Sequence, residues 1–205
     1  MEKNESLTGR CICGQVKYRI TEKPLFTQAC HCKDCKIITG SSYVINTSVL
    51  DNTLIIEGNI SSTELKTGSG ATSRAYFCNK CGTYIYTDYA TAVGRSTVRT
   101  KTLDNSENFP PEAHIFTKDK DPWLKLTDDA NCFEKMYDLK NTWPKESYER
   151  YKNYLLLFFK YSPYLFKLSS GHVFFGSYIF SKQITSSVRF NHGSLSFVKI
   201  CTCGG

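Results

Sequence analysis

Residues 9–20 read GRCICGQVKYRI. Two cysteines of this stretch, Cys11 and Cys13, stand one residue apart, and Gly14 follows the second. Alternate side chains of extended backbone share one face, so both thiols can hold the same ion. The stretch therefore predicts half of a metal site that opens a β-rich domain.

The other half of this site is predicted at residues 77–86, which read FCNKCGTYIY. Cys-x-x-Cys-Gly is the zinc-knuckle pattern: a tight turn aims two thiolates inward, and the glycine accepts a positive φ. Cys78, Cys81 and Gly82 fit it. We predict that the two cysteine pairs close one four-ligand structural zinc site, which ties the start of the domain to its middle.

Three more cysteines, Cys30, Cys32 and Cys35, lie in ACHCKDCKIITGSSY at residues 29–43. Three protein ligands with a fourth position left for water or substrate are typical of a catalytic zinc site. We expect His31 to point to the opposite face of extended backbone, as a packed or exposed histidine. His114 or Cys132 could instead complete the tetrahedron from a distance, and the second site would then be inert.

Composition sets the class of protein. The chain has 205 residues, ten cysteines, 26 Lys and Arg against 19 Asp and Glu, and a net charge of +7. These values exclude collagen, a coiled coil and wholesale disorder. The opening MEKNESLTGR lacks the apolar core of a secretory signal, and no window is apolar enough to cross a membrane. We expect a reducing, cytoplasmic setting, where cysteines bind metal rather than form disulfides.

The charge is unevenly distributed along the chain. All 19 acidic residues lie before residue 154, together with 21 of the basic ones, so residues 154–205 hold five basic residues and no acid. This tail is a lineage extension, a basic membrane-surface segment or translated non-coding sequence, and the last interpretation is slightly favoured. Cys201 and Cys203 at its end lack a second pair, so we do not expect them to bind metal.

The three cysteine motifs, followed by KTLD at 101–104 and HIFTKDKDPWLKL at 114–126, resemble in order and spacing the glutathione-dependent formaldehyde-activating enzyme (GFA) family, also called the CENP-V/GFA domain. The resemblance covers about residues 7–128. It implies a mainly β, Mss4-like (β-tent) antiparallel sheet domain that binds two zinc ions, one structural and one catalytic. Residue by residue, the structural ligands match Cys11, Cys13, Cys78 and Cys81, and the catalytic ligands match Cys30, Cys32 and Cys35.

The same resemblance implies a function. Family members look like carbon–sulfur lyases, and the prototype is an S-(hydroxymethyl)glutathione synthase that joins glutathione to formaldehyde. The expected partners are a small thiol such as glutathione and an aldehyde. Lys33 and Lys36 flank Cys35 and could meet an anionic thiol or simply be solvated. No residue is predicted as general acid or base.

A binding module is the alternative: an inactive zinc scaffold that holds a protein or a nucleic acid. Residues 1–153 are close to neutral, however, so they lack the excess of positive charge that nucleic-acid binding needs. Zinc stoichiometry discriminates the two functions, because the enzyme needs a second ion with an exchangeable ligand.

Strand signals occur at 16–20, 43–49, 54–58 and 83–87, with turns at 51–52 and 68–70. Helical periodicity is not evident before about residue 130, and a short helix is predicted at 145–153 after Pro144. We predict a zinc domain at 7–135, a short extension at 136–153 and the atypical tail at 154–205. Trp123 is expected to pack at a core edge, and His114 to be a structural histidine.

Overall fold

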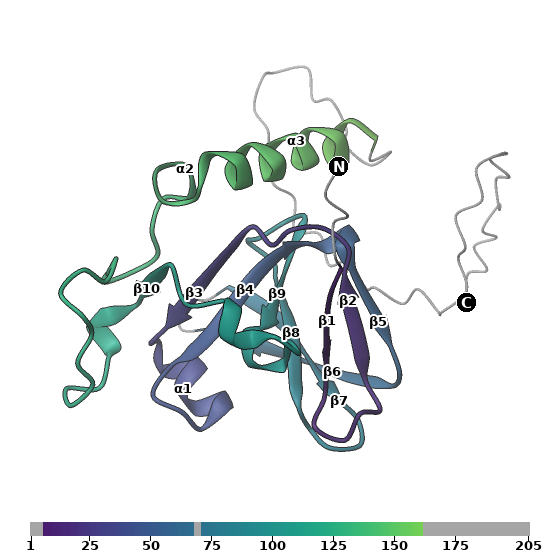
Figure 1. The fold of residues 1–205 in the computed structure, drawn as a ribbon, viewed down its shortest axis with the longest axis horizontal. Coiled ribbons are helices and arrows are strands. Elements are labelled where there is room, and N and C mark those ends of the chain that lie inside the picture. Colours follow the sequence, from purple (N-terminus) through teal and green to yellow (C-terminus); the bar gives the residue numbers. More distant parts are fainter. Residues whose placement is uncertain (1–5, 68–70, 162–205) are drawn as a thin grey trace, which may run out of the picture. The chain divides into compact units, whose positions relative to one another are not determined.

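The structure is a computed structural model that describes residues 6–67 and 71–161. The predicted turn at 68–70, both C-terminal cysteines and the tail beyond Tyr161 lie outside the described residues. Two sheets and a few short helices make up the described part (Figure 1).

The smaller sheet has three antiparallel strands in the order β1-β2-β5. They are β1 (Leu7–Arg10), β2 (Lys17–Ile20) and β5 (Leu54–Glu57). Strand β2 lies where a strand was predicted, and it alternates: Tyr18 and Ile20 are buried whereas Lys17 and Arg19 are exposed. One face of this sheet therefore packs on the rest of the domain.

The larger sheet has seven strands in the order β10-β3-β4-β9-β8-β7-β6. They are β3 (Phe26–Cys30), β4 (Val44–Leu50), β6 (Ile60–Lys66), β7 (Thr72–Cys78), β8 (Tyr84–Tyr89), β9 (Arg95–Arg99) and β10 (Ala113–Ile115). Its neighbours are antiparallel except β10, which pairs with β3 in parallel. Strand β3 is buried along its whole length between β4 and β10.

The described residues include three α-helices: α1 (Lys33–Thr39), α2 (Leu139–Thr142) and α3 (Lys145–Tyr161). Short 3₁₀ turns lie at Asp51–Thr53, Thr100–Thr102, Ser106–Asn108 and Thr117–Asp119. Helix α1 stops at Gly40, whose left-handed φ of 62° suits glycine. Figure 1 shows α1 at one end of β3 and β4 and α2 with α3 at the other end.

Two hydrophobic cores hold the domain together. The first core lies between the sheets and is built on residues such as Val16, Tyr18, Val49, Ile85 and Val98. The second core joins β3, β4 and β10 to α1, α2 and α3, and it includes Phe26, Cys30, Cys35, Trp143 and Tyr151. Each cysteine group thus lies at a core: Cys11 and Cys78 belong to the first, and Cys30 and Cys35 to the second.

The predicted fold class, a mainly β, Mss4-like sheet domain, is confirmed, with β10 as the one parallel strand of the described sheets. The four predicted strands correspond to β2, β4, β5 and β8. Helix α1 was not predicted, and α3 is longer than the helix expected at 145–153.

The domain boundaries predicted from composition stay predictions. Helix α3 runs across the proposed boundary at residue 154, and Tyr154 and Leu155 on it pack against the second core. Among the described helices, none has the length and apolar character to cross a membrane.

Candidate metal centre

The structure brings Cys11, Cys13, Cys78 and Cys81 into one group, with their four Sγ atoms all within 4.8 Å of one another. The Sγ atoms of Cys11 and Cys13 are 3.4 Å apart, and those of Cys13 and Cys78 are 3.8 Å apart. Such a cluster of four thiols has the composition of a closed tetrahedral zinc site.

Two glycine turns form this first group. Gly14 N donates to Cys11 O at 3.0 Å, and Gly82 N donates to Cys78 O at 2.9 Å. Both glycines have a positive φ, 74° and 70°. Each turn folds its two thiols toward the same point, and this is why Cys-x-Cys-Gly and Cys-x-x-Cys-Gly can meet there.

Local donors favour the ionised form of two thiols in this group. Burial opposes ionisation of Cys11, but the N–H of Val16, 3.2 Å from its Sγ, and neighbouring thiols lower its pKa. The hydroxyl of Thr83, 3.1 Å from Cys81 Sγ, and the Thr83 backbone lower the pKa of Cys81 to about 5. Thiolates are the form that binds metal.

Cys30, Cys32 and Cys35 form the second group, and their Sγ atoms also lie within 4.8 Å of one another. Cys30 ends β3, Cys32 is the N-cap of α1, and Cys35 lies in the first turn of that helix. Cys35 N donates to Cys32 Sγ at 3.4 Å. Cys30 and Cys35 are buried and Cys32 is partly exposed, so Cys32 is the member of the group nearest to solvent.

Charge within this group is concentrated on Cys32. Hydrogen bonds from the Cys30 and Cys35 thiols, with backbone N–H groups of α1, lower the pKa of Cys32 to about 3. The Cys32 thiolate, together with burial, raises the pKa of Cys30. Three such thiols in a closed space are strongly coupled, and a bound cation is the simplest means of ionising all of them.

Both groups fit zinc on the chemistry of their donors, because soft thiolates favour Zn²⁺ in tetrahedral geometry. All eight cysteines that the structure describes are free thiols, and Cys132 is exposed and outside both groups. Within the described residues, no fourth side chain shares the 4.8 Å cluster of Cys30, Cys32 and Cys35. The assignment of the seven cysteines as zinc ligands stays a prediction.

His31 and His114 pair with each other instead of joining the sulfurs. His31 Nε2 lies 3.0 Å from His114 Nδ1, and the two rings stack with centroids 5.3 Å apart. Burial lowers the pKa of both rings, to about 4 for His31. Neutral imidazoles next to the second group therefore add no positive charge at pH 7.

The two lysines near Cys35, Lys33 and Lys36, differ in their contacts. Lys36 Nζ contacts Asp121 Oδ1 at 2.5 Å and donates to Asp119 O at 2.9 Å, so it fastens α1 to the segment after β10. Lys33 is exposed. Of the two alternatives left open for these lysines, contact with an anionic thiol or solvation, neither describes Lys36, which is paired with Asp121, whereas both stay open for Lys33.

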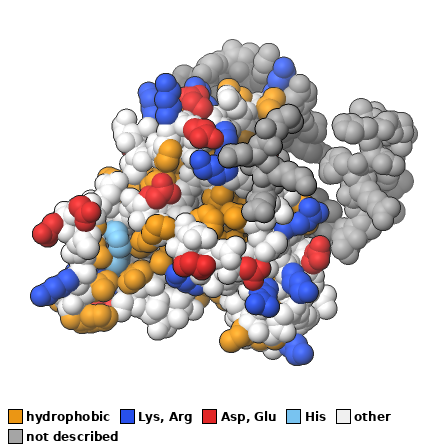
Figure 2. Space-filling view, in the orientation of Figure 1, with side chains coloured by type: hydrophobic (Ala, Val, Ile, Leu, Met, Phe, Trp, Pro, Cys, Tyr) orange, Lys and Arg blue, Asp and Glu red, His pale blue; other side chains and the backbone are white. Residues whose placement is uncertain are grey.

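Trp123 corrects a second expectation. Its side chain is 69% exposed, not packed at a core edge, because a tight turn closed by Leu124 N on Asp121 O directs it outward. Ile37 on α1 is 81% exposed. Figure 2 shows hydrophobic side chains at the surface around α1 and the segment after β10, with acidic and basic groups interspersed elsewhere on this face.

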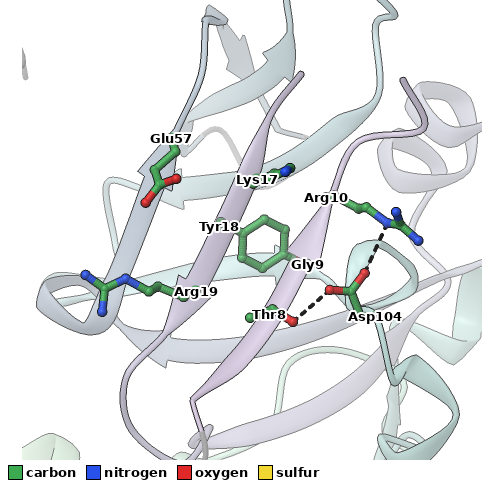
Figure 3. Close-up of a pocket in the computed structure, with 8 residues that line it drawn as sticks. All are labelled: Thr8, Gly9, Arg10, Lys17, Tyr18, Arg19, Glu57 and Asp104. Atoms are coloured by element: carbon green, nitrogen blue, oxygen red, sulfur yellow. Dashed lines mark hydrogen bonds and ion pairs between the residues drawn. The ribbon is translucent and has the colours of Figure 1, made fainter. Parts of the chain in front are cut away.

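A hollow of about 610 Å³ lies elsewhere, on the outer side of the smaller sheet (Figure 3). In Figure 3, Thr8 and Arg10 both reach Asp104, at 2.7 and 3.2 Å. None of the seven clustered cysteines lines this hollow, which is bordered by Thr8, Gly9, Arg10, Lys17, Tyr18, Arg19, Glu57 and Asp104. The hollow is therefore separate from both cysteine groups.

A family model described as glutathione-dependent formaldehyde-activating enzyme matches residues 6–119, more than half of the chain. The chain belongs to this family. The family match spans all seven clustered cysteines and ends before α2 and α3, so both helices lie outside the matched part of this GFA family member.

Other comparisons add little. No curated protein matches this family member. A crystal structure of a Rhodobacter sphaeroides protein is similar at 22% identity and a TM-score of 0.38, and the match covers 48% of this chain and 88% of that one.

Sequence reasoning missed two polar residues near the second group. Arg99 on β9 and Asn46 on β4 are both buried and hydrogen-bonded to each other. They are 53 residues apart in sequence, and only the register of β4 against β9 brings them together. Both strands are rich in polar residues, so no signal in the sequence singled out these two.

Proposed function

We propose that this protein is a zinc-dependent carbon–sulfur lyase that adds a thiol such as glutathione to a small aldehyde, as an S-(hydroxymethyl)glutathione synthase does. One observation carries the proposal: the group of Cys30, Cys32 and Cys35 supplies three sulfurs without a fourth described side chain among them. Membership in the GFA family supports glutathione and formaldehyde as substrates.

The two cysteine groups have different roles in this proposal. Cys11, Cys13, Cys78 and Cys81 hold a structural zinc ion, which fixes the smaller sheet to β7. Cys30, Cys32 and Cys35 would hold a second ion at the end of β3 and the start of α1, and a substrate would approach them from the partly exposed side of Cys32. A zinc ion held there lowers the pKa of a bound thiol, so the substrate sulfur is ionised at neutral pH.

The proposed reaction needs no redox partner. The substrate sulfur forms a bond to the aldehyde carbon, the carbonyl π electrons pass to oxygen, and that oxygen takes a proton from water. The product is a hemithioacetal, and the reverse reaction breaks the same carbon–sulfur bond. Free thiols at all described cysteines support a reducing, cytoplasmic setting.

The experiment uses the full chain. Zinc is counted by mass spectrometry, and hemithioacetal formation from glutathione and formaldehyde is followed by NMR exchange spectroscopy. We expect two zinc ions and a rate above the spontaneous one, and Cys32→Ser should lose both the second ion and the rate enhancement. Cys132→Ser is the matched control, because Cys132 is exposed and lies outside both groups.

The opposite outcome supports the binding module. One zinc ion, or two ions with no acceleration for any thiol and aldehyde tested, contradicts the lyase function. A Cys32→Ser variant as active as the wild type contradicts the assigned site.

A further inference from the structure

Arg99 is a buried cation that lacks a carboxylate partner within the described part of the chain. It ends β9 and is 5% exposed. Its Nη1 donates to Asn46 Oδ1, its guanidinium carbon lies 3.9 Å from the centroid of the Tyr84 ring, and its Nε has no hydrogen-bond partner. None of the ion pairs between described residues includes it.

The sheet register places Arg99 on the same face as the second cysteine group. Arg99 pairs with Asn46 across β9 and β4, and Asn46 pairs with Gln28 across β4 and β3. Two residues further along β3, Cys30 pairs with Val44. Because alternate residues of a strand share a face, Cys30, Asn46 and Arg99 project to the same side of the sheet.

A buried cation requires a compensating negative charge. Burial acts against the charge of Arg99, but Tyr84, Tyr89 and Cys35 raise its pKa, so the guanidinium stays ionised. The cysteine group that begins at Cys30 lies on the same face of the sheet as Arg99. Three thiolates around one divalent ion leave a negative charge, and a fourth thiolate adds another.

We propose that Arg99, held by Asn46 and Tyr84, is the fixed counter-charge of this cysteine group and makes it select an anionic sulfur as its fourth ligand over a neutral one. The inference rests on the proposed function and adds its specificity determinant. In this proposal Arg99 is a positioning residue: it supplies a fixed positive charge to the cysteine group and does not itself contact the substrate.

The test measures ligand binding rather than turnover. The full chain is loaded with Co²⁺, whose visible absorption reports each added ligand, and is titrated at one pH with glutathione, 2-mercaptoethanol and imidazole. For Arg99→Met we expect at least a tenfold loss of affinity for both thiols and unchanged affinity for imidazole, which brings no charge. Arg99→Lys should restore thiol affinity to within a few-fold of the wild type.

A second variant neutralises the charge without removing the side chain. Asn46→Asp is nearly isosteric and places a carboxylate on Arg99, so it should weaken both thiols as Arg99→Met does. Thr63→Asp is the matched control, because it adds the same charge on the exposed edge strand β6. The four-cysteine group takes no external ligand, and its spectrum confirms that each variant is folded.

Three results would overturn the inference. Equal loss of thiol and imidazole affinity in Arg99→Met and Asn46→Asp would make Arg99 a packing residue, and loss for glutathione alone would make it a contact of the peptide carboxylates. Unchanged thiol affinity in both variants would contradict the inference while leaving the proposed function intact. A wild type that binds neither thiol would contradict the proposed function itself.

Discussion

At the scale of single residues, the cysteines of the two groups should contribute differently to the stability of the fold. Cys78 is 1% exposed and belongs to the first core, and its group joins the start of the family domain to its middle. Cys32 is partly exposed and sits at the rim of the second group, on the short helix α1. Loss of a ligand should therefore affect folding in the first group and ion binding in the second.

We predict that Cys81→Ser lowers the free energy of unfolding by at least about 3 kcal/mol, because the ion that cross-links the sheets is lost. Cys32→Ser should lower it by less, because its group joins only residues 30–35 and does not link the two sheets. Urea unfolding followed by circular dichroism measures both values. Equal effects of the two variants would contradict the division into four structural and three catalytic ligands.

Gly9 on β1 is a second residue whose replacement should lower the free energy of unfolding. A Cβ at this position would lie 2.2 Å from Tyr18 Cζ and 2.6 Å from Thr102 O. Gly9→Ala should lower the free energy of unfolding by about 1 to 3 kcal/mol, since the Tyr18 ring must move. Thr8→Ala, at an exposed hydrogen bond, is the comparison, and we expect about 0.5 kcal/mol for it.

At the scale of elements, α3 continues across the boundary that composition placed between residues 153 and 154. Tyr154 Oη donates to Asp51 Oδ1 at 2.6 Å. Tyr154 and Leu155 also lie close to Gly94, where a Cβ would be 3.0 Å from Leu155 Cδ2. These contacts fall beyond residue 153, so the packed helix includes the start of the acid-free segment.

A chain shortened after Asn153 should therefore be less stable than one shortened after Tyr161. We expect a difference of about 2 to 4 kcal/mol, from the lost burial of Tyr154 and Leu155 and the lost hydrogen bond to Asp51. Thermal unfolding of the two chains side by side measures it. Indistinguishable melting temperatures would show that the domain ends where composition placed its boundary.

The elements also show what the sequence could and could not predict. Cysteine spacing indicated both sulfur groups, because the ligand geometry is local in each motif. Strand β3 was missed because it is buried on both faces, so Phe26–Cys30 shows no alternation. Helix α1 is too short for a period, although Asp34 in its first turn and Gly40 at its end were readable signals.

Contacts that depend on the register of paired strands could not be predicted from the sequence. Arg99 meets Asn46 only because β9 pairs with β4. His31 meets His114 only because β10 adds in parallel beside β3. The sequence around Trp123 suggested a core edge, and the turn that exposes it depends on where the chain leaves β10.

At the scale of the whole molecule, buried tyrosines make stability depend on alkaline pH. Burial raises the pKa of Tyr76 and Tyr137 to about 12, and it also raises the pKa of Tyr18 and Tyr86. An unfolded tyrosine ionises near pH 10. Each of these groups therefore stabilises the fold fully below pH 10, and this contribution is lost as the pH rises toward the folded pKa.

We predict that stability falls between pH 10 and pH 12 by about 1.4 kcal/mol per pH unit for each such tyrosine. Urea unfolding at pH 9.5 and 11 measures the loss, and absorbance at 295 nm reports tyrosinate. Tyr137→Phe should show a smaller pH dependence, although it leaves Gln28 and Trp143 without their shared partner. A tyrosinate signal with a midpoint near pH 10 in the folded protein would contradict the prediction.

The position of β10 in the larger sheet has a consequence for biosynthesis. Strand β3 leaves the ribosome long before β10, which covers its outer edge, and before Trp143 and Tyr151, which complete the second core. During that interval the thiols of Cys30, Cys32 and Cys35 are not yet covered by β10 and the second core. The growing chain is therefore open to oxidation and to capture of a wrong metal at these thiols until β10 and α3 have emerged.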